Sequence, residues 1–379
     1  MSPDTPTDRL RVLHIITTGD RRGAEMFAAD LIRALSASGV DQRVAVLRGS
    51  PPLPAGFEAP VEVLSSGRGG LIPGLRMDPR IAWRLRSVCR RWRPHVVQVH
   101  GGEPFKYAAL VAGRRDRIVY RRIGLSPDRA TRGLTGLTYR LLMRRCRMIV
   151  AVAEAVRRET IDAFGVAADR VVTIPRGVDP GRVGSSLGRD GSRERLRIPL
   201  DAPVVISLGA LSWEKDPLAQ LEVMEGVRRV LPGSVHLIAG DGPLRHDVER
   251  EADHAGLDGL ARILGSRSDV ADLLAAADVL LLASKVEGMP GCVIEAGMSG
   301  LPVVSYAVAG VPEVVIDGET GYLVGPGEIG GLIDRTIELL KDPTQRARMG
   351  VAARDRCTAA YDIGVIAPKY LEIYKEVGR

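Results

Sequence analysis

Apolar side chains recur along this chain in two alternating patterns. Short runs rich in β-branched residues have the composition of buried strands, and the stretches between them carry apolar residues at helical spacing. In the first half of the chain the strand-like runs are Arg11–Ile16, Gln42–Leu47, Val96–His100 and Arg117–Arg121. Strands that alternate with helices in this way predict parallel sheets with helices on both faces.

The second half of the chain repeats the alternation. The predicted pairs of strand and helix are Val204–Leu208 with Pro217–Val230, Ser234–Ala239 with Arg245–Ala255, Ala261–Leu264 with Val270–Ala276, and Val279–Ala283 with Pro290–Ser299. A chain of 379 residues is longer than one such core usually holds. We therefore expect an α/β protein with two doubly wound, Rossmann-like domains.

The segment 177–199 separates the two halves. It is rich in Gly, Ser, Pro and charged residues and has no periodic apolar pattern, so it is predicted to be an irregular linker. We accordingly expect an N-terminal domain over residues 1–180 and a C-terminal domain over residues 181–364. The last stretch, Ile366–Val377, has amphipathic spacing, and a closing helix at about 365–379 can pack back on the N-terminal domain.

Composition excludes several classes of protein. The apolar fraction of 45% is ample for a folded core, and a net charge of +7 from 53 basic and 46 acidic side chains is small for this length, which excludes disorder. The four cysteines have no spacing typical of a disulfide scaffold or zinc module, which favours a reduced cytoplasm. No apolar stretch has the length of a signal peptide core or a membrane span. We expect a cytoplasmic protein, with peripheral contact at the inner face of the membrane as the alternative.

The net charge is divided unevenly along the chain. Residues 1–180 contain 31 basic and 17 acidic side chains, a net charge of +14, whereas residues 181–379 contain 22 and 29, a net charge of −7. Two halves of opposite charge predict two domains with different partners. The few aromatic residues and the absence of a recognisable binding motif argue against a nucleic-acid partner.

The basic half contains an arginine-rich helix, predicted over Arg80–Arg93. Its apolar stripe consists of Ile81, Leu85, Val88 and Trp92. The simplest interpretation is that this stripe faces the core and that the arginines are solvated. The alternative is peripheral attachment to anionic lipid through these arginines and those of 140–147.

The segment Val279–Val304 carries the most specific chemistry. An apolar strand leads into a loop with Glu287, Gly288 and Gly291, and a helix with Glu295 follows. In an open α/β domain the carboxyl end of a strand and the start of the next helix bind anions, because the first N–H groups of the helix are unpaired. A carboxylate set back from the loop can accept hydrogen bonds from a ribose diol. The simpler alternative is that both carboxylates are solvated.

Glu287 and Glu295 form an E-x7-E pair inside the sequence EGMPGCVIEAGMSGLPVV. This segment resembles the signature of the family 4 retaining glycosyltransferases, which have the GT-B fold of two Rossmann-like domains facing each other across a cleft. The resemblance implies that Glu287 contacts the donor sugar and that Glu295 binds the nucleotide ribose. It also implies donor contacts for the residues that follow Glu287, namely Gly288, Met289, Pro290, Gly291 and Cys292.

Further segments resemble the same family, in the same order along the chain. GDRRGAE at 19–25 resembles its first glycine-rich loop, with Gly23 at the point of close backbone approach. His100 matches the histidine of its catalytic cleft. VVTIPRGVD at 171–179 resembles an interdomain IPNGVD segment, with Arg176 in place of Asn.

The C-terminal half adds three motifs to this resemblance. LGALSWEKD at 208–216 resembles a phosphate site that contains Gly209 and Lys215. GDGP resembles a turn of the family and implies donor contacts for Gly240 and Gly242. GSRSDVADLL resembles the segment of the base pocket, with Arg267 at its centre.

Lys215 is the predicted cation for the diphosphate. A compact ammonium that follows a strand and a short loop can neutralise a phosphate, although a solvated surface lysine is the simpler alternative. The chain departs from the family at Ala210, where an arginine commonly provides a second diphosphate ligand. Either Lys215 and backbone amides suffice, or Arg21, Arg22 or Arg267 substitutes for that arginine.

The resemblance implies a retaining, hexosyltransferase-like enzyme that moves a sugar from an NDP-sugar to the hydroxyl of a lipid-linked, glycan or small-molecule acceptor. His100, Lys215 and Glu287 are the candidate catalytic residues. No metal and no cofactor are expected, because helix dipoles and Lys215 can stabilise the leaving diphosphate. Two alternatives remain open: another GT-B sugar-nucleotide enzyme, such as an epimerase or a glycosyl-phosphate-forming enzyme, and a catalytically idle nucleotide-sugar-binding scaffold.

Overall fold

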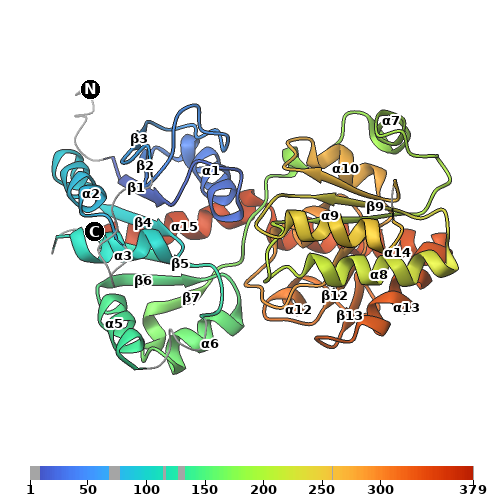
Figure 1. The fold of residues 1–379 in the computed structure, drawn as a ribbon. Coiled ribbons are helices and arrows are strands. Elements are labelled where there is room, and N and C mark those ends of the chain that lie inside the picture. The colour runs from blue at the N-terminus through green and yellow to red at the C-terminus, as the bar shows by residue number, and fades with distance from the viewer. Residues whose placement is uncertain (1–8, 68–76, 114–116, 127–132, 258, 379) are drawn as a thin grey trace. The chain divides into compact units, whose positions relative to one another are not determined.

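The computed structural model describes residues 9–67, 77–113, 117–126, 133–257 and 259–378. The chain divides into two compact units (Figure 1). The N-terminal unit comprises residues 1–177 together with 363–379, and the C-terminal unit comprises residues 178–362. The two-domain α/β fold expected from the apolar pattern is confirmed, and each unit is built around its own parallel sheet.

The sheet of the N-terminal unit has, within the described residues, seven parallel strands in the order β3-β2-β1-β4-β5-β6-β7. These strands are β1 (Arg11–Ile16), β2 (Asp41–Val46), β3 (Val61–Val63), β4 (Val96–His100), β5 (Arg117–Arg122), β6 (Cys146–Ala151) and β7 (Val171–Thr173). Its helices are α1 (Gly23–Leu35), α2 (Pro79–Trp92), α3 (Gly102–Val111), α5 (Gly133–Met143), α6 (Glu154–Asp162) and α15 (Ile363–Gly378). The strand order reverses between β1 and β4, which are neighbours in the sheet although β2 and β3 lie between them in the chain.

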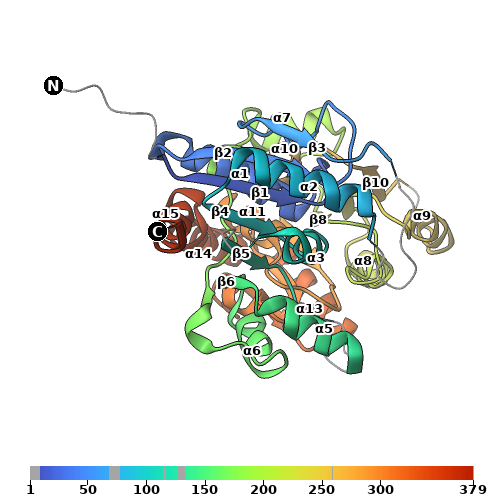
Figure 2. The ribbon, with the colours of Figure 1, turned by 90° about the vertical axis from the view of Figure 1, so that its left-hand side faces the viewer.

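One face of this sheet is covered by α1 and α15 (Figure 2). Phe27 and Leu31 of α1 pack in one apolar cluster with Ile366, Tyr370 and Tyr374 of α15 and with the facing strand residues. Burying such a stripe stabilises a fold by roughly 25 cal/mol for each Å2 of apolar surface removed from water. The last helix of the chain is therefore part of the core of the N-terminal unit.

The sheet of the C-terminal unit has six described parallel strands in the order β10-β9-β8-β11-β12-β13. These strands are β8 (Val204–Leu208), β9 (Val235–Ala239), β10 (Ala261–Gly265), β11 (Val279–Leu282), β12 (Val303–Tyr306) and β13 (Gly321–Val324). Its helices are α7 (Gly188–Arg195), α8 (Pro217–Val230), α9 (Arg245–His254), α10 (Val270–Ala276), α11 (Gly291–Met298), α12 (Val311–Val314), α13 (Ile329–Lys341) and α14 (Pro343–Tyr361). Here the strand order reverses between β8 and β11.

The predicted irregular linker over residues 177–199 is wrong in its second half, because α7 forms there. The sequence of this helix is mostly charged and has no periodic apolar residues from which a helix could be predicted. Arg193 is fully buried, and its guanidinium donates to the carbonyl oxygens of Ala276 and Ala202 and pairs with Asp278. An arginine that is hydrogen-bonded and paired in this way can anchor a helix as an apolar residue would.

Candidate functional site

The C-terminal unit brings the predicted donor residues together at the reversal of its strand order. Lys215 lies in the loop after β8, and Glu287 lies in the loop after β11. Because β8 and β11 are neighbours and parallel, both loops leave the same edge of the sheet. In open α/β sheets, ligands bind outside the carboxyl ends of the strands at this point, since the two loops diverge there.

Lys215 and Glu287 contact each other directly, because Nζ of the lysine donates to Oε1 of the glutamate. The side chain of Glu287 is 7% exposed and that of Lys215 is 24% exposed. The alternative that Glu287 is a solvated loop residue is therefore wrong. A pair of this kind presents one cationic and one anionic group at the same point of the sheet edge.

Helix α11 begins next to this pair. The sequence predicts a start at Pro290, but Pro290 occupies the N-cap position and the helix begins one residue later, at Gly291. No described side chain caps the helix. Gly288 is held in the preceding loop by its carbonyl oxygen, which accepts from the N–H of Gly310. Met289 and Gly291 are buried, and Cys292 is half-buried. The start of α11 thus lies beside Lys215 and Glu287, and helix starts of this kind favour anions.

Glu295 lies inside α11, and its carboxylate accepts a hydrogen bond from Arg182. Arg182 ends a short 3-10 helix over Pro180–Arg182, within the segment that the sequence indicated to be irregular. Sequence reasoning missed this partner, because the two residues are 113 positions apart. The alternative of a solvated Glu295 is wrong, since its side chain is only 14% exposed.

Gly209, Gly240 and Gly242 of the predicted donor site lie where two loops approach each other closely through their backbones. Gly240 has a φ of 154°, and a Cβ on it would lie 1.7 Å from the carbonyl oxygen of Gly209. A Cβ on Gly242 would lie 2.4 Å from the carbonyl oxygen of Leu211. The turn after β9 therefore packs backbone to backbone against the loop after β8 that leads to Lys215. Only glycine allows this approach, because every other residue adds a Cβ.

Arg267 lies after β10, where its guanidinium forms two hydrogen bonds with the carboxylate of Asp269, at 2.8 and 2.6 Å. This carboxylate raises the pKa of Arg267, with the side-chain hydrogen bonds as the main cause. Asp269 also pairs with Arg195. Ala210 is exposed in the loop after β8. Arg267 thus pairs with Asp269. That it binds the diphosphate in place of the arginine missing at position 210 stays a prediction.

The N-terminal unit repeats the arrangement with other residues. Gly23 begins α1 directly after the loop that follows β1, and His100 ends β4. Both therefore lie where the strand order of the N-terminal sheet reverses. No described side chain caps α1. A Cβ on Gly23 would lie 2.8 Å from a guanidinium nitrogen of Arg176. Arg21 and Arg22 are exposed in the same loop.

His100 is buried, with 1% of its surface exposed. Its ring stacks on His14 of β1, with the ring centroids 5.5 Å apart, and it packs beside Phe27 of α1. Burial is the main reason why the pKa of His100 lies well below its usual value, and the neighbouring His14 and Arg121 lower it further. His100 is therefore a neutral imidazole at physiological pH.

Comparison with known proteins follows the same division of the chain. Residues 188–356 match the family described as Glycosyl transferases group 1, and residues 21–182 match the family described as Glycosyltransferase Family 4. The chain belongs to the family 4 glycosyltransferases of the GT-B fold. The first match includes the E-x7-E pair, which confirms the resemblance carried by that pair.

Relatives and solved structures agree with this assignment. The glycosyltransferase is 26% identical to the lipopolysaccharide core biosynthesis glycosyltransferase LpsE of Rhizobium meliloti, over 94% of this chain and 96% of that protein. Its fold matches Anabaena HepE in complex with UDP and glucose, with a TM-score of 0.84 at 20% identity, covering 97% of this chain and 100% of HepE. It also matches sucrose-phosphate synthase of Thermosynechococcus elongatus, with a TM-score of 0.83 at 19% identity, covering 97% of this chain and 99% of that one. The structural matches establish the GT-B fold.

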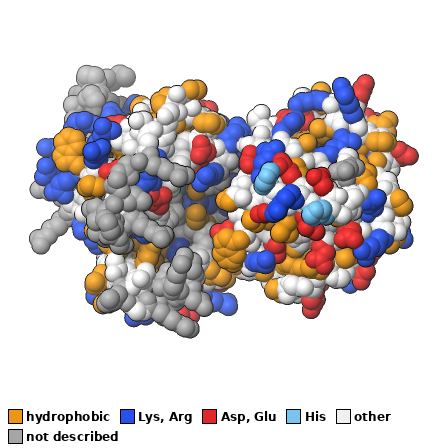
Figure 3. Space-filling view, viewed as in Figure 1, with side chains coloured by type: hydrophobic (Ala, Val, Ile, Leu, Met, Phe, Trp, Pro, Cys, Tyr) orange, Lys and Arg blue, Asp and Glu red, His pale blue; other side chains and the backbone are white. Residues whose placement is uncertain are grey.

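The basic surface of the glycosyltransferase includes α2. Ile81, Leu85 and Val88 of the predicted stripe are buried, whereas Trp92 is half-buried beneath the guanidinium of Arg43. The stripe therefore faces the core, as the simplest interpretation predicted. In Figure 3 basic side chains surround an apolar patch at the end of the N-terminal unit where α2 lies. Among the described helices, none combines the length and apolarity required to cross a bilayer.

Proposed function

We propose that this glycosyltransferase transfers a sugar with retention from an NDP-sugar to the hydroxyl of an acceptor. The observation that carries the proposal is the pair Lys215–Glu287 at the switch point between β8 and β11, beside the uncapped start of α11. A cation, a carboxylate and the N–H groups of a helix start, held at one place, are the chemistry that suits a sugar diphosphate. A donor of this kind is supported by the solved neighbours, because HepE has been crystallised with UDP, with UDP-glucose, and with UDP and glucose.

In this mechanism Lys215 neutralises the negative charge that develops on the departing diphosphate. The N–H groups at the start of α11 bind the same group, so part of the stabilisation needs no cation. Glu287 binds hydroxyl groups of the donor sugar, which compete with Lys215 for its carboxylate. The loss of one such preorganised contact typically lowers kcat by about 100- to 1,000-fold.

Glu295 is proposed to bind the ribose diol. Arg182 donates to Oε1 of this carboxylate and so fixes its position, and a carboxylate can accept hydrogen bonds from two neighbouring hydroxyls. Gly23 and His100 of the N-terminal unit are proposed as further donor-side contacts. The mechanism assigns no role to a metal or a cofactor, and its charge stabilisation comes from Lys215 and helix ends.

The experiment is a calorimetric screen of the full chain against nucleoside diphosphates and NDP-sugars, beginning with UDP-glucose. Binding of one NDP-sugar that is weakened in the Glu295→Ala variant supports the donor site. If the wild type and the Glu295→Ala variant bind each tested nucleotide with the same affinity, the proposed donor site is rejected. Retention is measured separately, by following the anomeric configuration of the first product by NMR.

Product analysis with the donor found in this screen distinguishes the two alternatives. An epimerase changes the NDP-sugar without releasing the nucleoside diphosphate, and a scaffold binds it without turnover. Release of the nucleoside diphosphate together with formation of a glycoside supports transfer. Loss of this release in the Glu287→Gln variant would place the activity at the proposed site.

We further propose that the N-terminal unit contacts anionic membrane through the arginine-rich surface of α2 and α5. Trp83 of α2 is 72% exposed, and Leu137 and Leu141 of α5 are each 52% exposed, beside arginines of the same helices. Exposed apolar side chains among basic ones suit the headgroup region of a bilayer. The test is co-sedimentation at low salt with vesicles of anionic or zwitterionic lipid. We expect binding to anionic vesicles only, and less of it in the Trp83→Ala variant.

A further inference from the structure

Four polar side chains form a row across one face of the N-terminal sheet. Gln42, His14, His100 and Arg121 lie on β2, β1, β4 and β5, the face that α1 and α15 cover. All four are buried, with at most 7% of their surface exposed. The row crosses the sheet from the amino end of β2 to the carboxyl ends of β4 and β5. Buried polar groups of this kind are ordered by the hydrogen bonds that they make.

The orientation of Gln42 is set by the backbone of α1. Its Nε2 donates to the carbonyl oxygen of Ile32 at 3.0 Å, and a carbonyl oxygen can only accept. The other end of the amide, Oε1, therefore points to His14, whose Nε2 lies 3.2 Å away. Because Oε1 can only accept, Nε2 of His14 must carry the proton.

This assignment continues to His100. Burial lowers the pKa of His14 to about 4, so the ring is neutral and only one nitrogen carries a proton. Nδ1 of His14 is then an acceptor, and it lies 3.2 Å from Nε2 of His100. The hydrogen bond between the two rings requires the proton to be on Nε2 of His100. Since that ring is also neutral, its Nδ1 carries a lone pair and no proton.

Nδ1 of His100 is buried and has no hydrogen-bond partner among the described residues. The same holds for Nε of Arg121, a donor on the residue that pairs with His100 in the register of β4 and β5. An unpaired acceptor and an unpaired donor thus lie on the same face of adjacent strands. A hydroxyl group suits both, because it donates one hydrogen bond and accepts others.

We propose that Gln42 and His14 are positioning residues that hold His100 in its Nε2–H tautomer, so that its bare Nδ1 accepts a hydrogen bond from a substrate hydroxyl. The hydroxyl belongs to the sugar transferred, a point that rests on the proposed function. His100 therefore binds and orients substrate, and it does not supply a proton.

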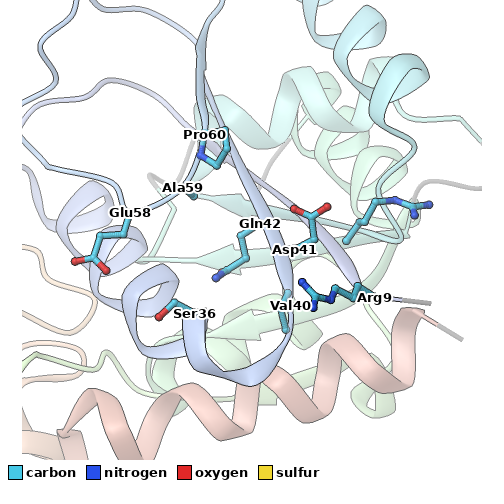
Figure 4. A pocket seen from close by; sticks show the side chains of 9 residues that line it. Arg9, Ser36, Val40, Asp41, Gln42, Glu58, Ala59 and Pro60 are labelled. Carbon is cyan, nitrogen blue, oxygen red and sulfur yellow. The ribbon is translucent and has the colours of Figure 1, made fainter. Parts of the chain in front are cut away.

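Gln42 is the end of this row that borders an open pocket. It lines an open pocket of about 500 Å3 at the amino ends of β1 and β2, together with Arg9, Asp41 and Glu58 (Figure 4). The residues of this pocket lie at the opposite ends of the strands from Gly23 and His100. Substitutions of Gln42 can therefore alter the tautomer of His100 without changing a residue of the candidate site.

The direct test is the protonation state of His100 in the full chain without ligand. Two-bond 1H–15N correlation spectra of histidine-labelled protein at pH 7 report which ring nitrogen carries the proton, and His100→Asn assigns the signal. We expect Nε2–H and an unprotonated Nδ1. A proton on Nδ1, or on both nitrogens, overturns the proposal. No sugar nucleotide is needed, so this result is independent of the proposed function.

Variants test the chain of hydrogen bonds. Gln42→Met removes the acceptor of His14, and His14→Phe keeps a stacked ring but removes the acceptor of His100. In both we expect the His100 signals to change to a mixture of tautomers. The matched control is Gln98→Met, a buried amide on β4 that bonds to Tyr374 and to the backbone of Val99, and it should leave the signals unchanged. Unchanged His100 signals in either folded variant overturn the proposal.

Turnover tests the contact at Nδ1, with UDP-glucose as the first probe. The amide of His100→Asn places a polar atom near the position of Nδ1, whereas that of His100→Gln places it near Nε2. We expect kcat of the Gln variant to be about tenfold below that of the Asn variant, the size of one neutral hydrogen bond. Equal losses in both variants would overturn the contact. Absence of turnover in wild type counts against the proposed function and leaves the tautomer measurement standing.

Discussion

Nζ of Lys215 forms an ion pair with Glu287, although the two residues lie 72 positions apart in the chain. They meet because β8 and β11 are neighbours at the reversal of the strand order. The ammonium donates directly to the carboxylate. The pair therefore holds the carboxylate and the ammonium at the position where the sugar diphosphate is proposed to bind.

The first prediction concerns the charge of Lys215. Lys215→Met keeps most of the alkyl chain but removes the ammonium, so kcat should fall by about 100- to 1,000-fold through loss of leaving-group stabilisation. Initial rates with the donor found in the screen measure this. The control is Lys285→Met, which removes an exposed lysine that pairs with Asp216 in the same region. An unchanged kcat in Lys215→Met would contradict the assignment.

The second prediction concerns Glu295. Glu295→Gln keeps the shape of the side chain and removes its charge, so affinity for the nucleoside diphosphate should fall by about ten- to 100-fold, the range of hydrogen bonds to charged groups. Titration calorimetry measures the change. Glu225→Gln, which removes an exposed carboxylate paired with Arg229 on α8, should leave affinity unaltered. Equal affinities in wild type and Glu295→Gln would exclude a ribose contact.

The third prediction concerns the buried ion pair that anchors α7. Asp278 is 4% exposed and accepts from Arg193 and from the N–H of Val204. Asp278→Asn leaves the charge of Arg193 buried without its counterion and should lower the free energy of unfolding by about 3 kcal/mol or more. Urea denaturation measures this. Asp272→Asn, whose partner Arg195 is half exposed, should cost less than about 1 kcal/mol.

The fourth prediction is a loss of stability in mild acid. Burial lowers the pKa of His14 to about 4 and that of His236 to about 3, against about 6.5 in an unfolded chain. The unfolded state therefore binds protons first as the pH falls below about 6.5. The stabilising effect of each neutral ring, complete above that pH, is lost at about 1.4 kcal/mol per pH unit towards pH 4.

Denaturant unfolding of wild type between pH 7.5 and pH 5 measures this slope. His236→Gln keeps a donor near the hydroxyl of Ser207, to which Nε2 of His236 lies 2.9 Å away, but it cannot titrate. In this variant the free energy of unfolding should depend less steeply on pH, by the contribution of about one proton. His254→Gln, at an exposed position of α9, should retain the full slope. A slope equal in all three proteins would refute the prediction.

Local patterns in the sequence predicted most of the strands. Val96–His100 and Val204–Leu208 agree with β4 and β8 residue by residue, because a buried parallel strand is an unbroken apolar run bounded by polar loops. Helix α7 was not predicted, because its buried anchor is Arg193 and an arginine is expected to be exposed to solvent. Its burial depends on Asp278, a residue 85 positions away.

By itself, the sequence determined the α/β class, the two doubly wound sheets and the identity of Glu287 and Glu295 as an E-x7-E pair at a strand-to-helix loop. These follow from periodicity and spacing within one segment, where neighbours in the chain are neighbours in space. Tertiary structure alone decided that Lys215 pairs with Glu287 and that His14 contacts His100. Both contacts join strands that the reversal of strand order makes adjacent, and no local pattern records which distant strands become neighbours.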